Sequence, residues 1–488
     1  MNNTIHIIGS GFSALSASCY LSKAGYKVTV LEKNDTLGGR ARQFKKDGFT
    51  FDLGPSWYWM PDVFERFFAD FGKKPSDYYT LDKLSPGYEV YFGENDSIKV
   101  SDKLKEIYDM FDDNEEGSSE HLKSFLGIAK SNYDTAIKDL VYKPGVSPLE
   151  LVTTTTISRV SQFFSTIRKQ VRKNIKNSKL IQILEFPVLF LGAKPSNTPA
   201  FYNFMNYADF GLGTWHPRGG MYKVVEGMVS LAKSLGVQFE VNQNVEKILV
   251  DDKKNVKGLV VNGKEIKTNL VLSGADYHHT ETLLNQNLRQ YSESFWNKKT
   301  FAPSSLLFYV GFDKKIINAS HHTLFFDTDF DKHAEEIYDN PKWPTAPLFY
   351  ANFTSMTDKT SAPEDKEAGF FLIPLAPGIK DTPELREKYF LKIMDRFEKL
   401  TNQKVKENVL FKRSFCVKDF QEEYNSYKGN AYGMANTLLQ TAFLRPKIKS
   451  SIVNNLYFTG QLTVPGPGVP PALISGKIAS ELINKNQK

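Results

Sequence analysis

Cysteine is scarce in this sequence, and long hydrophobic runs are absent from it. Only two cysteines, Cys19 and Cys416, occur among the 488 residues, and they lie far apart. This count excludes a disulfide framework and a cysteine-based metal centre, and it favours the reducing cytoplasm. No apolar stretch reaches the roughly 18 residues of a membrane-spanning helix. The short apolar run that follows Thr4 ends at Gly9, too early for a secretory signal. We therefore expect a cytoplasmic protein without a membrane span.

Strong charge is missing as well. A net charge of +7 is a small excess for this length, so the distribution of charge matters more than its sum. Aromatic residues, by contrast, are abundant, with 37 Phe and 23 Tyr. Such residues fill cores and also line apolar ligand sites. The length suggests two or three domains, or one domain built on another.

The start of the chain has the pattern of a strand, a helix and a second strand. Residues 5–8 are apolar and predict a buried strand. Phe12 to Lys23 predicts a helix, which Gly25 ends in the usual place for a glycine. Residues 27–31 predict the second strand. Together they have the length of a βαβ unit.

The turn of this unit is suited to a dinucleotide. It reads Gly9-x-Gly11-x-x-Ala14, in which small residues permit a tight turn, close approach of a pyrophosphate and close packing of the helix. The helix N-terminus offers N–H groups to phosphate. Glu32 ends the second strand, where a carboxylate accepts hydrogen bonds from ribose and disfavours NADP. These residues leave NAD and FAD both open.

A second glycine pair favours FAD. The stretch VLEKNDTLGGRARQF, residues 30–44, resembles the second signature of the flavin amine oxidase and carotenoid desaturase superfamily. The resemblance implies that Gly38-Gly39-Arg40 lies along the FAD pyrophosphate. The chemistry agrees, because two glycines let backbone N–H groups reach a ligand and arginine supplies positive charge for phosphate.

Further segments are similar to the phytoene desaturase family over essentially the whole chain. They are DGFTFDLGPSWYWMP (47–61), WHPRGGMYKVVEGM (215–228), VLSGADYHH (271–279), SYKGNAYGMANTLLQTAFLRP (426–446) and NNLYFTGQLTVPGPGVPPALISGKIAS (454–480). The sequence departs from the family pattern at Gly274, Gln461, Leu462 and Pro467. The last three replacements are expected to alter the wall near the flavin ring.

The resemblance implies a bacterial-type acyclic carotenoid desaturase with non-covalently bound FAD. The cofactor-binding residues carried over are Gly9, Gly11, Phe12, Ser13, Ala14, Glu32, Lys33, Gly39, Arg40, Gly54, Pro55, Ser56, Val245, Gly460, Gly468, Val469 and Pro470. A phytoene-type desaturase and a hydroxycarotenoid 3,4-desaturase are not separated. Related flavoproteins that isomerise polyenes or oxidise end groups remain an alternative. A prenyl-binding protein resembling the Rab GDP-dissociation inhibitors, without flavin chemistry, is the alternative that is not an enzyme.

The implied fold is α/β, with a Rossmann-like FAD-binding domain, a mixed-sheet substrate domain and a helical membrane-associating region. The FAD-binding domain is expected to be discontinuous. Its predicted ranges are 1–75, 216–300 and 447–488; the substrate domain takes 76–144 and 301–446, and the helical region takes 145–215.

A hydrocarbon substrate offers no polar handle, so it must be held by shape and by burial of apolar surface. The predicted tunnel residues are Trp57, Trp59, Phe201, Phe204 and Tyr207. In such a reaction the cofactor carries the hydride step and the protein positions the substrate. The sequence has no metal-ligand cluster and no nucleophile motif, so no metal and no catalytic residue are predicted. The histidine pairs at 278–279 and 321–322 are expected in surface or polar-core roles.

Residues 157–175 predict an amphipathic helix with apolar residues every three to four positions. Basic residues lie among and after them, and no acidic residue occurs between Leu151 and Leu184. The basic residues are Arg168, Lys169, Arg172, Lys173, Lys176 and Lys179. The pattern favours peripheral contact with a membrane, from which a lipid-dissolved polyene would come. The alternative is a solvated basic face on a helix that packs on the core. No motif indicates nucleic-acid binding, and the oligomeric state stays open.

Overall fold

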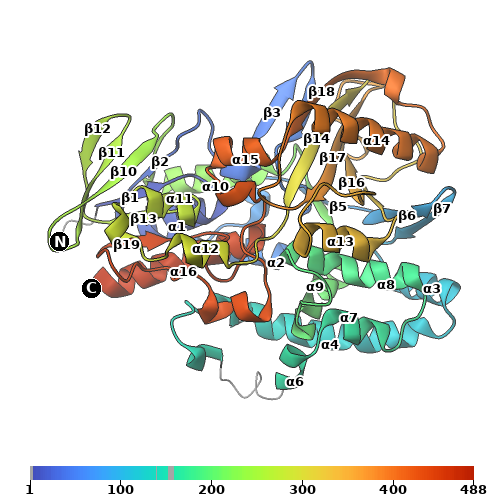
Figure 1. Ribbon diagram of the computed structural model, residues 1–488, viewed down its shortest axis with the longest axis horizontal. Coiled ribbons are helices and arrows are strands. Elements are labelled where there is room, and N and C mark those ends of the chain that lie inside the picture. The colour runs from blue at the N-terminus through green and yellow to red at the C-terminus, as the bar shows by residue number, and fades with distance from the viewer. Residues whose placement is uncertain (1–3, 139, 152–158, 488) are drawn as a thin grey trace.

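The computed structural model describes residues 4–138, 140–151 and 159–487. The α/β fold class predicted from the sequence is confirmed. In Figure 1 a parallel sheet with its helices occupies one side of the molecule, an antiparallel sheet the other, and a group of helices lies below both.

The first sheet is parallel and joins segments from the start, middle and end of the chain. Its strands in spatial order are β19 (Leu456–Phe458), β13 (Val271–Ser273), β1 (Thr4–Ile8), β2 (Lys27–Leu31) and β9 (Gln238–Glu240). Its helices are α1 (Phe12–Lys23), α10 (Tyr222–Ser234) and α16 (Val469–Gln487). The predicted βαβ unit at the chain start is confirmed, with the helix bounds that the sequence indicates.

The end of the chain packs tightly on its beginning. Gly476 of α16 lies so close to α1 that a β-carbon there would stand 2.3 Å from the carbonyl oxygen of Ser13. Ser16 of α1 donates a hydrogen bond to the carbonyl of Leu473 at 2.7 Å. Small side chains on both helices therefore hold together two segments that are far apart in sequence. A small antiparallel sheet extends this unit, with β10 (Val245–Val250), β11 (Val256–Val261) and β12 (Lys264–Lys267).

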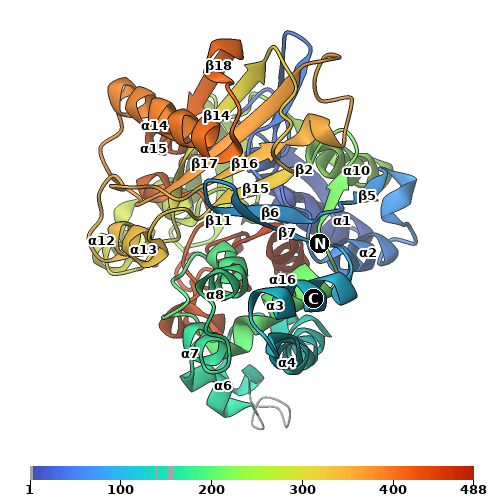
Figure 2. The ribbon, with the colours of Figure 1, turned by 90° about the vertical axis from the view of Figure 1, so that its right-hand side faces the viewer.

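The second large sheet has seven strands and is antiparallel except where β15 pairs with β6. Its strands in order are β18 (Val409–Phe415), β14 (Ser304–Phe312), β17 (Glu367–Leu375), β16 (Phe349–Phe353), β15 (His322–Phe325), β6 (Tyr88–Gly93) and β7 (Asp96–Val100). Helix α14 (Pro383–Thr401) covers one face (Figure 2). On β14 the side chains alternate, so that Phe308 packs toward α14 while Leu307 belongs to the main core on the opposite face. That opposite face is turned toward the parallel sheet.

The remaining helices lie mostly below the sheets or at their junction (Figure 2). They are α2 (Pro61–Ala69), α3 (Leu104–Asn114), α4 (Ser118–Lys138), α6 (Val160–Phe164), α7 (Ile167–Arg172), α8 (Ser178–Glu185), α9 (Phe204–Asn206), α11 (Tyr277–Thr282), α12 (Glu293–Asn297), α13 (Phe330–Tyr338) and α15 (Val417–Tyr424). Short strand pairs are β3 (Gln43–Lys46) with β4 (Phe49–Asp52) and β5 (Leu81–Lys83) with β8 (Trp215–Pro217). Among the described residues, no helix is both long and apolar enough to cross a membrane.

The single amphipathic helix predicted over 157–175 is wrong. Its first two residues lie outside the described part of the chain, and the rest forms two short helices, α6 and α7, separated at Ser165 and Thr166. Thr166 is extended and accepts a hydrogen bond from the N–H of Lys169, so it begins α7 as a cap instead of continuing α6. The spacing of the apolar residues alone does not reveal such a cap.

Candidate functional site

A cavity of about 450 Å³ runs between the two large sheets. At one end it is lined by residues that directly follow strands of the parallel sheet, such as Gly9 after β1, Glu32 after β2 and Gly274 after β13. This is the edge at which parallel α/β sheets bind ligands. At the other end the walls are apolar and come from the antiparallel sheet and α13. One continuous space thus joins a polar, glycine-rich part to an aromatic part.

The first glycine turn leaves backbone N–H groups open toward this cavity. Gly9 has a φ of 85°, a conformation that favours glycine, and a β-carbon on it would stand 3.4 Å from the nitrogen of Ala275. Gly11 precedes α1, and no side chain of residues 4–138, 140–151 or 159–487 caps the helix there. The first-turn N–H groups of α1 are therefore available to an anionic ligand.

Glu32 is held in place by hydrogen bonds from two neighbouring residues. Its carboxylate accepts from the N–H and hydroxyl of Ser10 at 3.0 and 2.6 Å, and from the N–H and side-chain amide of Asn34 at 3.0 and 2.9 Å. The side chain is buried and lines the cavity. No sequence motif points to Ser10 and Asn34, although Ser10 lies between Gly9 and Gly11.

The second glycine pair faces the first turn. The N–H of Gly38 contacts the carbonyl and the hydroxyl of Ser10 at 3.2 and 3.1 Å. A β-carbon on Gly39 would stand 3.2 Å from the α-carbon of Gly11. The two turns therefore line the same part of the cavity, with Ser10 between them.

Arg40 supplies a buried positive charge beside these turns. Its guanidinium donates to the hydroxyl of Ser426 at 3.1 Å and, with the Gln461 amide oxygen turned toward it, to Gln461 at 3.1 Å. Its Nε has no partner among the described residues. Burial lowers the pKa of Arg40, and the nearby Asp276 partly opposes this. A buried cation with an unsatisfied N–H at the wall fits a phosphate group, so the residues present suit a dinucleotide such as FAD.

The last strand and helix complete the polar end. Gly460 has a φ of 112° and its N–H donates to Ser475 at 3.0 Å. A β-carbon on Gly460 would stand 3.2 Å from the hydroxyl of Ser13. Most predicted cofactor residues line the cavity, namely Gly9, Gly11, Phe12, Ser13, Glu32, Lys33, Gly39, Arg40, Gly54, Pro55, Ser56, Val245, Gly460, Gly468 and Val469.

Ala14 and Pro470 are the two predicted residues that do not line it. Ala14 instead packs against Gly274, where a β-carbon would stand 2.8 Å from that of Ala14. This contact gives a physical reason for the glycine at 274, since an asparagine there would collide with α1. Pro470 lies in the first turn of α16.

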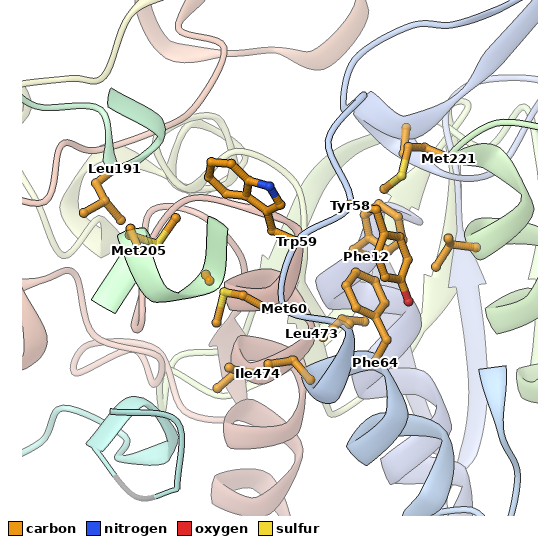
Figure 3. Packing of buried hydrophobic residues seen from close by; sticks show 14 of the residues in the cluster. Phe12, Tyr58, Trp59, Met60, Phe64, Leu191, Met205, Met221, Leu473 and Ile474 are labelled. Carbon is orange, nitrogen blue, oxygen red and sulfur yellow. The ribbon is translucent and has the colours of Figure 1, made fainter. Parts of the chain in front are cut away.

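Of the predicted tunnel residues, the structure places only Trp57 at the cavity wall. Trp59 is buried between segments, donates to Thr214 at 2.8 Å, and packs in the core with Met60, Leu191 and Met205 (Figure 3). Phe201, Phe204 and Tyr207 belong to the helical region, where Phe204 and Tyr207 pack on Tyr133 of α4. They fill core space because the segment that carries them folds onto α4.

Other aromatic residues form the apolar walls and were not singled out from the sequence. They are Phe186, Phe326, Phe330, Tyr338, Phe349, Tyr350 and Tyr432. Several of these residues lie in the aromatic-rich stretches at 322–330 and 348–353. Such stretches are equally typical of an ordinary hydrophobic core, so they do not identify a cavity wall. His333 lines the wall too, and burial lowers its pKa to about 4, so it is neutral at pH 7. No group of three or more potential metal ligands occurs in the part of the chain that the structure describes.

Comparison with known proteins adds a family and two close relatives. The family model described as flavin containing amine oxidoreductase matches residues 12–484. A carotenoid 3,4-desaturase of Haloarcula japonica is 40% identical, and the match covers 98% of this chain and 97% of that one. A 4,4'-diapophytoene desaturase (4,4'-diaponeurosporene-forming) of Staphylococcus haemolyticus is 31% identical, with 98% of each chain covered.

Solved structures share the fold at low sequence identity. A putative protoporphyrinogen oxidase from Exiguobacterium has a TM-score of 0.63 and 13% identity, and the match covers 99% of each chain. At that identity the likeness concerns the fold alone.

Proposed function

This chain belongs to the family of flavin-containing amine oxidoreductases, and we propose that it is an FAD-dependent desaturase of an acyclic carotenoid. The observation that carries the proposal is the single cavity that joins two glycine turns and a buried arginine to an aromatic compartment. No Asp, Glu, Lys or Arg among the described residues lines the aromatic end, which suits a hydrocarbon. The 40% identical carotenoid 3,4-desaturase supports the same substrate class.

FAD fits the polar end without a covalent bond. We assign the pyrophosphate to the N-terminus of α1 and the facing turn at Gly39, with Arg40 as its counter-charge. Glu32 would accept hydrogen bonds from the adenosine ribose, and Val245 would contact the adenine through its backbone. The flavin supplies an acceptor for hydride. The protein binds the substrate, excludes water and aligns the reacting carbon–carbon bond.

Within this class we favour 3,4-desaturation near a chain end, because the 3,4-desaturase relative is more similar than the diapophytoene desaturase, at 40% against 31% identity. Polyene isomerisation or end-group oxidation on the same fold is the second candidate. Prenyl binding without redox chemistry is the third, and the partly unsatisfied buried Arg40 argues against it.

The test is product analysis with purified, FAD-loaded protein. Phytoene, lycopene and hydroxylated carotenoids are supplied in lipid vesicles, and products are separated and weighed by mass spectrometry. Desaturation lowers the mass by two hydrogens and shifts absorption to the red. Products of unchanged mass would favour isomerisation, and a gain of oxygen would favour end-group oxidation. A protein that never acquires a flavin spectrum would support the prenyl-binding alternative.

Peripheral contact with a membrane is the second part of the proposal. Exposed apolar side chains occur on α6 and on the segments 146–149 and 438–444, and these segments lie on the lower side of the molecule in Figure 1. The side chains are Val146, Leu149, Phe164, Leu438, Leu439 and Leu444, and we call them the apolar rim. Gly145 packs against the carbonyl of Ala442, which brings two of these segments together. The segment that follows Tyr432 at the cavity wall leads to Leu438 and Leu439 on the rim, which supports access from lipid.

The basic residues of this region contribute less than their number suggests. Arg168 and Arg172 each form salt bridges with Asp331 and with Glu185, whose side chain is buried. Lys179 pairs with Asp96 at 2.6 Å. Lys169 and Lys173 are exposed and form no salt bridge among the described residues. The proposed membrane contact therefore relies on the apolar rim, with these two lysines beside it.

A further inference from the structure

A polar group interrupts the apolar wall next to Trp57. Ser56 and Tyr350 both line the cavity, and their hydroxyls lie 2.9 Å apart. Behind them, His322 Nδ1 lies 2.7 Å from the Tyr350 hydroxyl. The imidazole stacks on Trp57, with ring centres 4.0 Å apart and planes 10° from parallel. Tyr350 therefore stands between the substrate space and a buried histidine.

The hydrogen bonds determine which nitrogen of His322 carries the proton. Asn352 lies directly opposite His322 in the β15–β16 pair, and its amide nitrogen is 3.3 Å from His322 Nδ1. The amide orientation is fixed because its oxygen accepts from Thr354 and its nitrogen donates to the His321 carbonyl. Since the amide nitrogen can only donate, Nδ1 of His322 is an acceptor and Nε2 bears the hydrogen. The Tyr350 hydroxyl then donates to the histidine.

His322 is neutral, and its Nε2 has no hydrogen-bond partner among the described residues. Burial lowers its pKa well below the ordinary value, and the neighbouring His216 lowers it further. The ring centre of His321 lies 4.5 Å from that of His322 and 4.8 Å from that of His216. Nε2 of His216 in turn lies 3.1 Å from the carboxylate of Asp358. A second cavity of about 20 Å³, enough for one water molecule, is lined by both Ser56 and His216. The polar cluster thus continues away from the substrate space.

We propose that Tyr350 is the proton acceptor of the reaction and that His322 is the positioning residue that takes the Tyr350 proton in turn. The assignment rests on the proposed desaturase function. No other hydroxyl at the aromatic wall is bonded to a histidine among the described residues.

The atoms and electrons of this step balance. FAD held at the polar end would supply the hydride acceptor, so the first allylic carbon would lose one hydrogen together with its electron pair. The neighbouring carbon–hydrogen bond gives its electron pair to the new double bond and its proton to the Tyr350 oxygen. The Tyr350 hydroxyl proton moves to His322 Nδ1, so the tyrosine stays neutral and the imidazole becomes charged. A weak base is sufficient, because the hydrocarbon is strongly acidic once its hydride has left.

The experiment compares wild-type holoenzyme with Tyr350→Phe and His322→Gln. Glutamine can still accept a hydrogen bond from Tyr350 but cannot take its proton. We expect both variants to bind FAD and carotenoid as the wild type does, measured by flavin fluorescence and by the absorption of carotenoid that stays with the protein after free carotenoid is removed. The hydride can return as long as the substrate cation keeps its proton, so net flavin reduction in a single anaerobic turnover should slow about 100-fold. Wild-type reduction should be slower in D₂O, and this solvent isotope effect should vanish in Tyr350→Phe.

Tyr91→Phe is the matched control. Tyr91 lies in the same sheet as Tyr350 and does not line the cavity, and its replacement by Phe removes one hydrogen bond, to the Asn318 carbonyl. Its reduction rate should equal that of the wild type. Nitrogen NMR of histidine-labelled wild-type holoenzyme gives a readout without turnover, and His322 should show hydrogen on Nε2 alone. Hydrogen on Nδ1, or wild-type rates in both variants, would overturn the assignment. Wild-type holoenzyme that desaturates no carotenoid would overturn the proposed function as well.

Discussion

Gly54 lies directly against the carbonyl group of Arg40, so that a β-carbon on Gly54 would stand 2.4 Å from the Arg40 oxygen. A contact this short can only be relieved by moving backbone. The adjacent Leu53 donates to the Arg42 carbonyl at 2.7 Å, which ties the two segments together. Gly54 therefore sets the distance between the segment that carries Arg40 and the one that carries Ser56 and Trp57.

We predict that Gly54→Ala weakens FAD binding by at least about 10-fold, or roughly 1.4 kcal/mol. The methyl group would push Arg40 out of its place at the polar end of the cavity. Titration of the apoprotein with FAD, followed by flavin fluorescence, measures the change. Gly127→Ala is the control, because no atom of the described residues lies within 4 Å of a β-carbon there. Equal affinities for the two variants would refute the steric role of Gly54.

Glu32→Gln should lower FAD affinity by about 10- to 100-fold. The carboxylate accepts hydrogen bonds from Ser10 and Asn34, and a neutral amide accepts fewer and leaves buried donors without partners. The ribose contact proposed for Glu32 weakens at the same time. Glu226→Gln serves as the control, since Glu226 lies on the surface of α10 and, in the part of the chain that the structure describes, pairs only with Lys223. The same titration decides, and an unchanged dissociation constant for Glu32→Gln would contradict the assignment.

Asp209 should make the protein less stable as the pH rises. Burial raises its pKa from 3.8 to about 8, and Tyr88 donates to it at 2.8 Å. The folded protein therefore keeps this proton at neutral pH, whereas the unfolded chain releases it above about pH 4. The free energy of unfolding falls between about pH 4 and pH 8 for this reason.

The variant Asp209→Asn keeps an acceptor for Tyr88 and has no proton to lose. It should be more stable than the wild type at pH 8 by at least about 1 kcal/mol and equally stable at pH 4. Urea unfolding at several pH values, at constant FAD, checks this. Burial also raises the pKa of Asp52, Glu281 and Glu367. The free energy of unfolding of the variant therefore still falls with pH, but less steeply than that of the wild type. If the free energy of unfolding depends on pH in the same way for variant and wild type, Asp209 does not contribute to that dependence.

The polar end of the site was predictable because its determinants are local. The turn from Gly9 to Ala14 and the acid at Glu32 are spaced by one βαβ unit, and the structure has that unit where the spacing indicates. Ser10 was overlooked because no fingerprint specifies it. Only the meeting of the two turns reveals that it bonds Glu32 and Gly38 together.

The aromatic end was not predictable in the same way. Tyr350 and His322 are brought together by pairing of β15 with β16, and Tyr432 comes from a later segment. Whether an aromatic residue lines a cavity or fills a core depends on which segment lies opposite it in the fold. Amino-acid composition gives no information about that neighbour. Trp57 and Trp59 illustrate the point, since the first lines the cavity and the second packs in the core.

The proposed membrane contact can be tested at its most exposed side chains. Leu149, Phe164 and Leu439 of the apolar rim are 75%, 76% and 75% exposed. Replacing all three by Asp should reduce sedimentation with anionic liposomes by about 10-fold or more, because burial of each apolar side chain contributes roughly 1.5–3 kcal/mol. None of the three residues lines the cavity, so FAD binding should not change.

Ile317→Asp is the matched control for the rim variant, because Ile317 is also 75% exposed and lies beside the antiparallel sheet. It should sediment with liposomes as the wild type does. Reversal of Lys169 and Lys173 tests the lysines separately and should weaken binding less, with an effect that disappears in high salt. Arg168 and Arg172 are unsuitable for reversal, since a new acid would lie against the buried Glu185. If the triple variant and Ile317→Asp both sediment like the wild type, the rim is not the membrane contact.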